Sequence, residues 1–264
     1  MNKVLTIAGS DSGGGAGIQA DLKTMTAHKV YGASVITAVT SQNTEGVQDV
    51  EVLAGEVVEK QLSSVLGDIS FGAVKTGMLA KKEIVKITAQ KIKDYGINNL
   101  VVDPVMVATS GDLLLEKNAV LAYKKSLIPL AKVITPNLSE AKVLTGRRDE
   151  NKVSLKVLAK ELHELGSEYV LVKGGHENSR KKFAIDILYD GREYTQYKAK
   201  RINTKDTHGT GCTFSSAIAS CLARGKSMKK AVSESKKYIT SAIETGFTVG
   251  KGNNPVNHLV NFKK

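Results

Sequence analysis

The stretch Val4-Leu5-Thr6-Ile7-Ala8 and the loop after it, Gly9-Ser10-Asp11-Ser12-Gly13-Gly14-Gly15-Ala16-Gly17, decide the fold that the sequence predicts. The first run is short, β-branched and mostly apolar, which is typical of a strand buried on both faces. Ile18–His28 then has the apolar spacing of a helix. A strand, a glycine-rich loop and a helix in this order form the first unit of an α/β fold.

The same alternation continues along the rest of the chain. Further strands are predicted at Ser34–Thr40, Phe71–Lys75, Leu100–Asp103, Val133–Thr135 and Tyr169–Lys173. Further helices are predicted at Glu56–Leu66, Lys82–Tyr95, Glu116–Leu127, Ser154–Leu165, Gly211–Arg224 and Met228–Glu244. Buried strands that alternate with helices predict a mostly parallel sheet covered by helices. The exception is Ile185–Tyr189, Asp190-Gly191 and Arg192–Tyr197, the pattern of a β-hairpin, which predicts an antiparallel addition near one sheet edge.

The composition is that of an ordinary globular protein. Of the 264 residues, 41% are hydrophobic and 24% are charged, which excludes disordered and collagen-like classes. No linker rich in Pro, Gly or Ser divides the chain, so we predict a single domain over residues 1–264. No apolar run is long enough for a membrane span or a signal peptide, and we expect a cytoplasmic protein without membrane contact.

The charge and the cysteines restrict the partners and the redox setting. The net charge is +12, but the cations are mostly lysines spread along the chain, and aromatic residues make up only 5%. This pattern argues against nucleic-acid binding, while a basic field suits a polyanionic small ligand such as a nucleotide. Cys212 and Cys221 share one predicted helix, about 13 Å apart along its axis, so they cannot form a disulfide with each other.

The loops that follow the strands are where a site is expected, because ligands of open α/β sheets bind at the carboxyl ends of the strands. The segment Thr207-His208-Gly209-Thr210-Gly211-Cys212-Thr213 opens a predicted helix. Its glycines let backbone N–H groups converge, which predicts an anion cradle, although a simple glycine-containing helix cap fits the same pattern. At the first turn, Cys212 is expected to have a lowered pKa, whereas Cys221 is expected to be a core residue.

Other strand-end residues have the chemistry of a phosphate or metal site. Lys173 is a candidate phosphate cation, although a strand-end lysine is often merely exposed. Asn137 and Glu140 could hold a hydrated Mg²⁺, but their spacing favours a capping box at a helix start. Asp103 is a further hard oxygen ligand. The glycines of the 9–17 loop indicate close approach of a ligand or simply a turn.

Taken together, these motifs resemble the ribokinase-like superfamily, and within it the hydroxymethylpyrimidine and hydroxymethylpyrimidine phosphate kinases of thiamine biosynthesis. The resemblance is carried by Leu5–Asp11, Gly17–Lys23, Gln42–Thr44, Lys75–Leu79, Thr135–Asn137, Lys173–His176 and Thr207–Thr213. It implies a three-layer αβα sandwich with a mostly parallel central sheet. It also implies ATP- and Mg²⁺-dependent phosphorylation of 4-amino-5-hydroxymethyl-2-methylpyrimidine to its monophosphate, and then to the pyrophosphate. Whether the protein is a monomer or a homodimer stays open.

The resemblance also assigns roles to individual residues. Cys212 would be the catalytic base, with Gly209, Thr210 and Gly211 holding the transferring phosphoryl group. The pyrimidine pocket would consist of Gln42, Gly9, Ala16, Met78 and Val105. The nucleotide would be bound by Lys173, Asn137 and Thr207, with Asp103 and Glu140 as ligands of Mg²⁺ and the adenine against the C-terminal helices. The amide of Gln42 offers both a donor and an acceptor, which matches the ring nitrogen and exocyclic amine of an aminopyrimidine.

The sequence leaves three alternative functions open. Pyridoxine kinases of the same subfamily share the cysteine, but they often have Met where this chain has Gln42. A dinucleotide-binding protein would need the G-x-G-x-x-G spacing, which the 9–17 loop lacks. A nucleic-acid-binding protein is the third alternative. Its binding of nucleic acid would weaken steeply with salt and would not depend on ATP.

Overall fold

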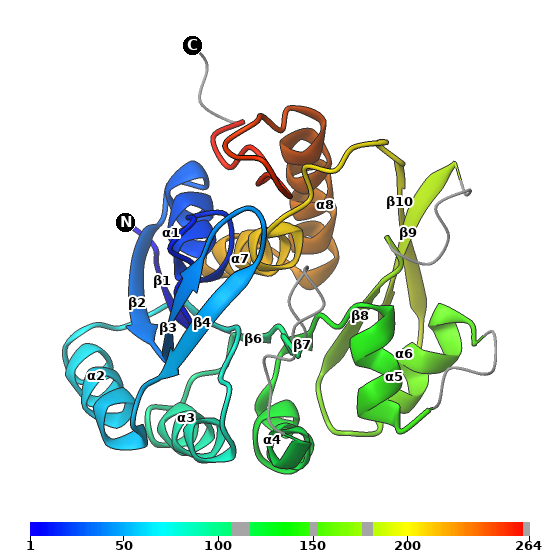
Figure 1. Cartoon of the computed structure of the whole chain (residues 1–264). Helices are drawn as coiled ribbons and strands as arrows, with labels where there is room; N and C mark the ends of the chain where they lie inside the picture. The colour runs from blue at the N-terminus through cyan, green and yellow to red at the C-terminus, as the bar shows by residue number, and fades with distance from the viewer. Residues whose placement is uncertain (107–116, 148–152, 176–181, 261–264) are drawn as a thin grey trace.

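The computed structural model describes residues 1–106, 117–147, 153–175 and 182–260, and its main feature is an eight-stranded sheet (Figure 1). The strand order is β10-β9-β8-β7-β6-β5-β1-β2. Neighbours from β2 to β8 pair in parallel, whereas β9 and β10 are antiparallel. The strands are β1 (Lys3–Ala8), β2 (Tyr31–Ile36), β5 (Ala73–Thr76), β6 (Leu100–Val102), β7 (Val133–Ile134), β8 (Tyr169–Lys173), β9 (Phe183–Tyr189) and β10 (Tyr194–Lys200). The predicted fold class is confirmed.

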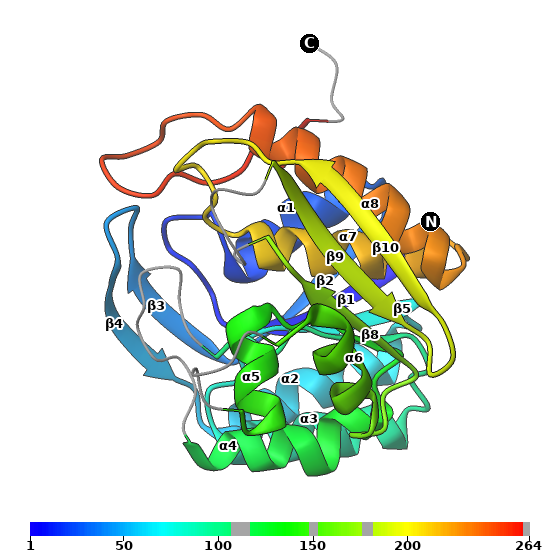
Figure 2. The same ribbon diagram turned by 90° about the vertical axis from the view of Figure 1, so that its right-hand side faces the viewer.

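Helices cover both faces of the sheet, as Figures 1 and 2 show. One face carries α1 (Gly17–Ala27), α7 (Thr210–Ala223) and α8 (Met228–Glu244). The other carries α2 (Gly55–Asp68), α3 (Lys82–Asp94), α4 (Lys117–Ala122), the π-helical and 3₁₀ turns η1 (Tyr123–Leu127) and η2 (Ile128–Leu130), α5 (Leu138–Thr145) and α6 (Leu155–His163). No helix within the described ranges is both long and apolar enough to cross a bilayer.

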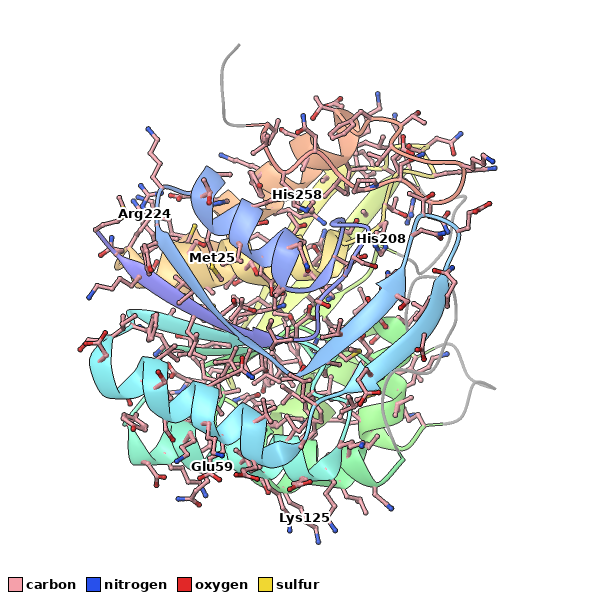
Figure 3. All side chains as sticks on the ribbon, turned by 60° about the vertical axis from the view of Figure 1, so that its left-hand side comes forward. Met25, Glu59, Lys125, His208, Arg224 and His258 are labelled. Atoms are coloured by element: carbon pink, nitrogen blue, oxygen red, sulfur yellow. The ribbon has the colours of Figure 1, made fainter. Side chains whose placement is uncertain are left out.

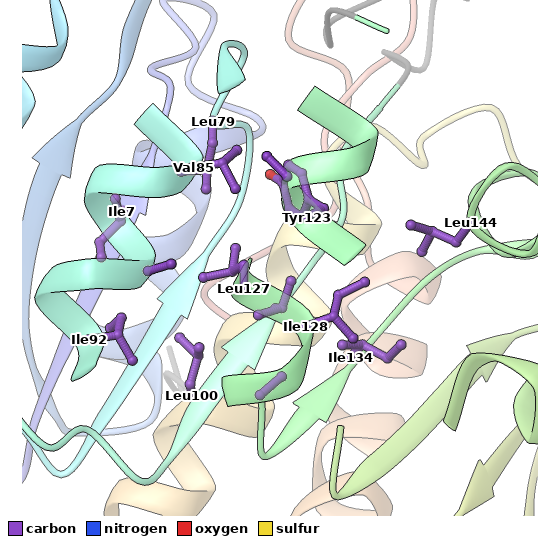
Figure 4. Packing of buried hydrophobic residues seen from close by; sticks show 14 of the residues in the cluster. Ile7, Leu79, Val85, Ile92, Leu100, Tyr123, Leu127, Ile128, Ile134 and Leu144 are labelled. Atoms are coloured by element: carbon purple, nitrogen blue, oxygen red, sulfur yellow. The ribbon is translucent and has the colours of Figure 1, made fainter. Parts of the chain in front are cut away.

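Alternation along the buried strands divides the core between the two faces. In β6, Val101 packs with α7 and α8, while Leu100 and Val102 pack into the larger cluster on the opposite face (Figure 4). Successive side chains of a strand point to opposite faces of the sheet. A strand that is apolar at every position therefore contributes side chains to the core on both faces. The side chains of residues 213–222 on α7 are all buried, since its many Ser and Ala residues let the helix lie close to the sheet.

Two segments differ from the sequence prediction. The predicted strand Ser34–Thr40 divides at Thr37, and its second half becomes β3 (Ala38–Gln42), which pairs with β4 (Val47–Val52) in a separate two-stranded sheet. Thr37 lies between the two strands, and its hydroxyl donates to the carbonyl of Met78 at 2.6 Å. The antiparallel β9–β10 hairpin is confirmed, with a turn that extends from Asp190 to Glu193. Of the predicted helix Glu116–Leu127, Glu116 lies outside the described residues.

Candidate active site

A cavity of about 670 Å³ lies at the carboxyl ends of the parallel strands. It brings together every site residue that the sequence predicted, from seven separate loops and helix starts. These residues are Gly9, Ala16, Gln42, Met78, Asp103, Val105, Asn137, Glu140, Lys173, Thr207, Gly209, Thr210, Gly211 and Cys212. The position agrees with the rule that open α/β sheets bind ligands beyond the carboxyl ends of their strands.

The anion cradle is built around Gly209, which is the N-cap of α7 and has a positive φ of 76°. A Cβ at this position would collide with the carbonyl oxygen of Gly15, so only glycine fits. Thr210 closes the turn by donating its hydroxyl to the carbonyl of Thr207 at 2.6 Å. A Cβ on Gly211 would lie 3.3 Å from the ammonium of Lys173, so the backbone amides and that cation face the same space. This is the arrangement that a phosphoryl group requires.

Asp11 links the glycine-rich loop to the cradle. Its carboxylate accepts from the backbone N–H groups of Gly13, Gly15 and Ala16 at 2.8, 3.0 and 2.7 Å. His208 Nε2 is 2.8 Å from Asp11 Oδ2, and 3.4 Å from the amide nitrogen of Gln42 (Figure 3 labels His208). Burial alone would raise the pKa of Asp11, but the bonds from His208 and the backbone lower it. The two loops are therefore joined by the contact between His208 and Asp11.

The pocket end that holds Gln42 is shaped by Met78 and Gly9. A Cβ on Gly9 would collide with the Met78 side chain, which places Gly9 and Met78 in contact. Tyr123 fixes this wall from below, because its buried hydroxyl donates to the carbonyl of Gly77 at 3.1 Å. Over the opening, the tip of the β3–β4 hairpin meets the C-terminal loop, where Asn253 N donates to the carbonyl of Thr44 at 2.7 Å.

Asp103 and Lys173 form a buried ion pair at the other end, with 3.0 Å between Nζ and Oδ1. Thr135 donates to the same oxygen at 3.0 Å, and Ser215 donates to Oδ2 at 3.1 Å. Burial alone would lower the pKa of Lys173, but Asp103 and Glu140 raise it. Lys173 is therefore a charged group held at a fixed position, and not an exposed strand-end lysine.

Asn137 and Glu140 form the capping box that their spacing favoured. Glu140 N donates to Asn137 Oδ1 at 2.9 Å, and Asn137 N donates to Glu140 Oε2 at 2.8 Å. Burial raises the pKa of Glu140 to about 7, with Lys173 opposing the shift and Asp103 adding to it. Among the described residues no group of three or more His, Cys, Asp or Glu could hold a metal. Two neighbouring buried carboxylates do fit Mg²⁺, which commonly uses one or two carboxylates together with substrate phosphates.

The expected lowering of the Cys212 pKa is wrong for the ligand-free site. Burial raises the pKa of its thiol to about 11, and this effect outweighs the opposing influence of Lys75 and of the Gly17 N–H group. The position at the first turn of α7 is as predicted. Cys221 is buried in the core, also as predicted, and both cysteines are free thiols.

Sequence reasoning assigned no role to several other residues that line the cavity. Lys75 is fully buried and pairs with Asp21, a contact between residues 54 positions apart. Asp186 pairs with Lys236 at 2.5 Å and also accepts from the N–H of Gly174, so it fixes the loop after Lys173. A lysine inside an apolar strand, as at Lys75, was the one available signal, because lysine is almost never fully buried unless it is paired.

The chain is similar in sequence and in structure to proteins that are already known. A family model described as phosphomethylpyrimidine kinase matches residues 11–257. The chain is 46% identical to the hydroxymethylpyrimidine/phosphomethylpyrimidine kinase of Haemophilus influenzae, covering 98% of this chain and 97% of that one. It is 48% identical to the thiamine biosynthesis bifunctional protein ThiED of Geobacter sulfurreducens, of which it spans about half, 52%. An ADP complex of Bacillus subtilis pyridoxal kinase superposes with a TM-score of 0.89 at 40% identity, covering 98% of this chain and 97% of that one.

Proposed function

The chain belongs to the phosphomethylpyrimidine kinase family, and from this premise we propose that it transfers the γ-phosphoryl group of ATP to 4-amino-5-hydroxymethyl-2-methylpyrimidine and then to the resulting monophosphate. The observation that carries the proposal is the single cavity in which the Gly209–Gly211 amides, Lys173 and Gln42 meet. Phosphoryl transfer asks a protein mainly to position the reactants and stabilise charge. The cavity offers both, within a volume suited to a small ring and a nucleotide.

The pyrimidine is proposed to bind against Gly9, Ala16, Met78 and Val105, with Gln42 reading the ring. In this pose the amide of Gln42 pairs with the ring nitrogen and the exocyclic amine. The hydroxymethyl group then points toward Cys212. The thiolate of Cys212 accepts the hydroxyl proton while the substrate oxygen attacks the γ-phosphorus. Because general-base catalysis requires this proton transfer, Cys212 is the catalytic residue of the first step.

The nucleotide is proposed to lie along Lys173, Asn137 and Thr207, with its γ-phosphate on the amides from Gly209 to Gly211. Lys173 is held by Asp103, so its charge is already directed at the cradle before ATP binds. Asp103 and Glu140 would hold Mg²⁺, which when bound neutralises charge on the phosphates. Thr210 supports the cradle through its bond to Thr207. A reducing, cytoplasmic setting belongs to the same proposal, since Cys212 acts as a free thiol.

The two phosphorylations are proposed to share this one site. The described residues contain one anion cradle, and one cysteine lies beside it. If the site is shared, the monophosphate competes with the alcohol. Simultaneous, independent turnover of both at saturation would contradict a shared site.

The function is tested by measuring ADP release with the pyrimidine alcohol, its monophosphate and pyridoxal side by side. Turnover of the first two, with little activity on pyridoxal, is the expected result. The second candidate is a pyridoxal kinase, favoured by the ADP-bound pyridoxal kinase that shares the fold at 40% identity. Turnover of pyridoxal alone would establish that alternative and contradict the first proposal.

A further inference from the structure

A fully buried ion pair lies beneath the cavity and takes no part in the steps above. Lys75 Nζ is 2.8 Å from Asp21 Oδ2 and 3.0 Å from Oδ1, and neither side chain is exposed. The hydroxyls of Thr6 and Ser216 donate to the same carboxylate at 2.5 and 2.6 Å. Burying two charges costs desolvation energy, so such a pair is weak evidence of a contribution to stability alone.

The ion pair is linked to the helix that carries Cys212, because α1 and α7 pack against each other and Lys75 and Cys212 line the same cavity. Cys212 and Ser216 are one turn apart on the same face of α7, and Gly17 and Asp21 are one turn apart on the same face of α1. One turn further along, the two helices are joined by the hydrogen bond that the Ser216 hydroxyl donates to the Asp21 carboxylate. At the cavity, the backbone N–H group of Gly17 on α1 acts on Cys212 of α7 and favours a lower pKa of its thiol. Cys212 therefore lines the cavity, and the ion pair contacts the next turn of the same helix.

The charges that surround the thiol come from three elements. Lys75 is on β5, Asp21 on α1, and Asp103 follows β6; Lys75 is the cation with the largest influence on Cys212. Among the described residues Asp21 is the hydrogen-bond acceptor of the Lys75 ammonium, which fixes its position. Burial alone would lower the pKa of Lys75, but Asp21, Cys212 and Asp103 raise it. Lys75 is thus a permanent cation that acts on the half-buried thiol of Cys212.

We propose that Lys75, anchored by Asp21, is a positioning residue that stabilises the thiolate of Cys212. This inference rests on the proposed function. Cys212 first releases its proton to solvent; the substrate O–H bond then breaks as the S–H bond forms. The substrate oxygen bonds to the γ-phosphorus, the bond from that phosphorus to the ADP oxygen breaks, and ADP leaves with the electron pair. Lys75 and the Gly17 N–H group favour the sulfur anion with which this sequence begins.

The test measures the thiol itself and does not depend on kinase activity. In a Cys221→Ala background, Cys212 is alkylated with iodoacetamide in nucleotide-free protein over a range of pH. Lys75→Met removes the cation and keeps most of the side-chain volume, and it is expected to slow alkylation at a fixed pH about tenfold, which corresponds to about one pKa unit. Lys173→Met is the matched control, since it removes another lysine that lines the cavity, and it should slow alkylation less.

A second variant distinguishes an effect on the Cys212 thiol from a loss of folding. Lys75→Met leaves Asp21 as an unpaired buried charge, whereas Lys75→Met combined with Asp21→Asn removes both charges. The double variant should fold and should still be alkylated more slowly than the parent. Alkylation at the parent rate in folded variants overturns the proposal, even if phosphorylation falls. Slower alkylation supports it, and the separate substrate assay on the unmodified protein decides whether the proposed function is correct.

Discussion

Cys212 is the residue whose substitution tests the proposed mechanism most directly. Cys212→Ala is expected to lower kcat for the pyrimidine alcohol by about 10²- to 10⁴-fold, the usual effect of removing a general base. The affinity for ATP should change little, because backbone amides and Lys173 hold the nucleotide. Turnover and ATP binding are measured separately by steady-state kinetics and calorimetry. The monophosphate, whose acceptor oxygen is already ionised near neutral pH, should lose less activity. Near-normal turnover of the alcohol would exclude the assigned role.

Gln42 is the residue expected to select the ring. Gln42→Met should reduce kcat/KM for the aminopyrimidine more than for pyridoxal, since each unpaired polar group in a dry pocket costs about 1–3 kcal/mol. His208, whose Nε2 lies 3.4 Å from the amide nitrogen of Gln42, is unchanged in this variant. The ratio of kcat/KM for the two substrates is the measurement. An unchanged ratio would mean that Gln42 has a structural role only.

Single residues show what the sequence could reveal about the site and what it could not. The loops that line the cavity were predictable, because they follow strands or begin helices as the Gly209 loop does, whereas Gln42 was included through the family resemblance. The pKa values of the side chains in the cavity could not be predicted. Cys212 was expected to have a lowered pKa from its place at a helix start, yet burial raises it to about 11. Burial depends on what packs around a side chain, and Lys75 and Asp21 come from distant segments.

Helix α5 is the element in which folding and function overlap. Glu140→Gln is expected to preserve the stability of the ligand-free protein, because glutamine can also complete a capping box. The same change should reduce Mg²⁺-dependent turnover, since it removes a candidate ligand charge. Asn137→Ala is the contrasting variant and should lower the free energy of unfolding by about 0.5–2 kcal/mol through loss of the cap. Thermal unfolding and Mg²⁺ titrations of activity separate the two effects. Full activity of Glu140→Gln would contradict its role as a ligand.

The elements were predictable where one pattern had one explanation. Strands β1, β5 and β8 and the α/β order follow from runs of apolar residues. The run Ser34–Thr40 was read as one strand because its residues are uniformly β-branched or small, and propensity does not record a change of sheet. The strand divides at Thr37, whose hydroxyl bonds to the carbonyl of Met78, 41 positions away. Strand β4 was missed because its partner, β3, had been assigned to the main sheet.

At the scale of the whole molecule, we propose that residues 1–264 fold as one domain. One sheet contains both β1, near the start of the chain, and β10, far along it. Helix α8 packs on the same face of that sheet as α1. A single cooperative thermal transition is therefore expected, since small single domains usually unfold without intermediates. ATP at about 100 times its Kd should stabilise the entire molecule by about 2.7 kcal/mol. Two separate transitions, with ATP shifting only one, would contradict a single domain.

The molecule is also expected to lose stability in mild acid. Burial lowers the pKa of His258 from 6.5 to about 4, so the unfolded chain binds a proton between these values that the folded chain does not. Stability should therefore fall as pH falls from about 6.5 to 4, by roughly 3 kcal/mol at most from this group. His258→Phe should flatten this pH dependence, measured by urea unfolding at several pH values. Tyr238, which donates to the His258 carbonyl at 2.6 Å, keeps its backbone partner in that variant. An unchanged slope would mean that other groups dominate.

The capping box of Asn137 and Glu140 has a consequence for how this site could evolve and be engineered. Both side chains contribute to a well-formed helix start, before any ligand is considered. A variant library screened only for folding would therefore enrich both residues, and that enrichment would carry no information about catalysis. The same overlap gives an evolutionary route, because a helix that begins in this way already presents the oxygen atoms that an ion can recruit. A lineage could gain or lose a nucleotide here without rebuilding the scaffold.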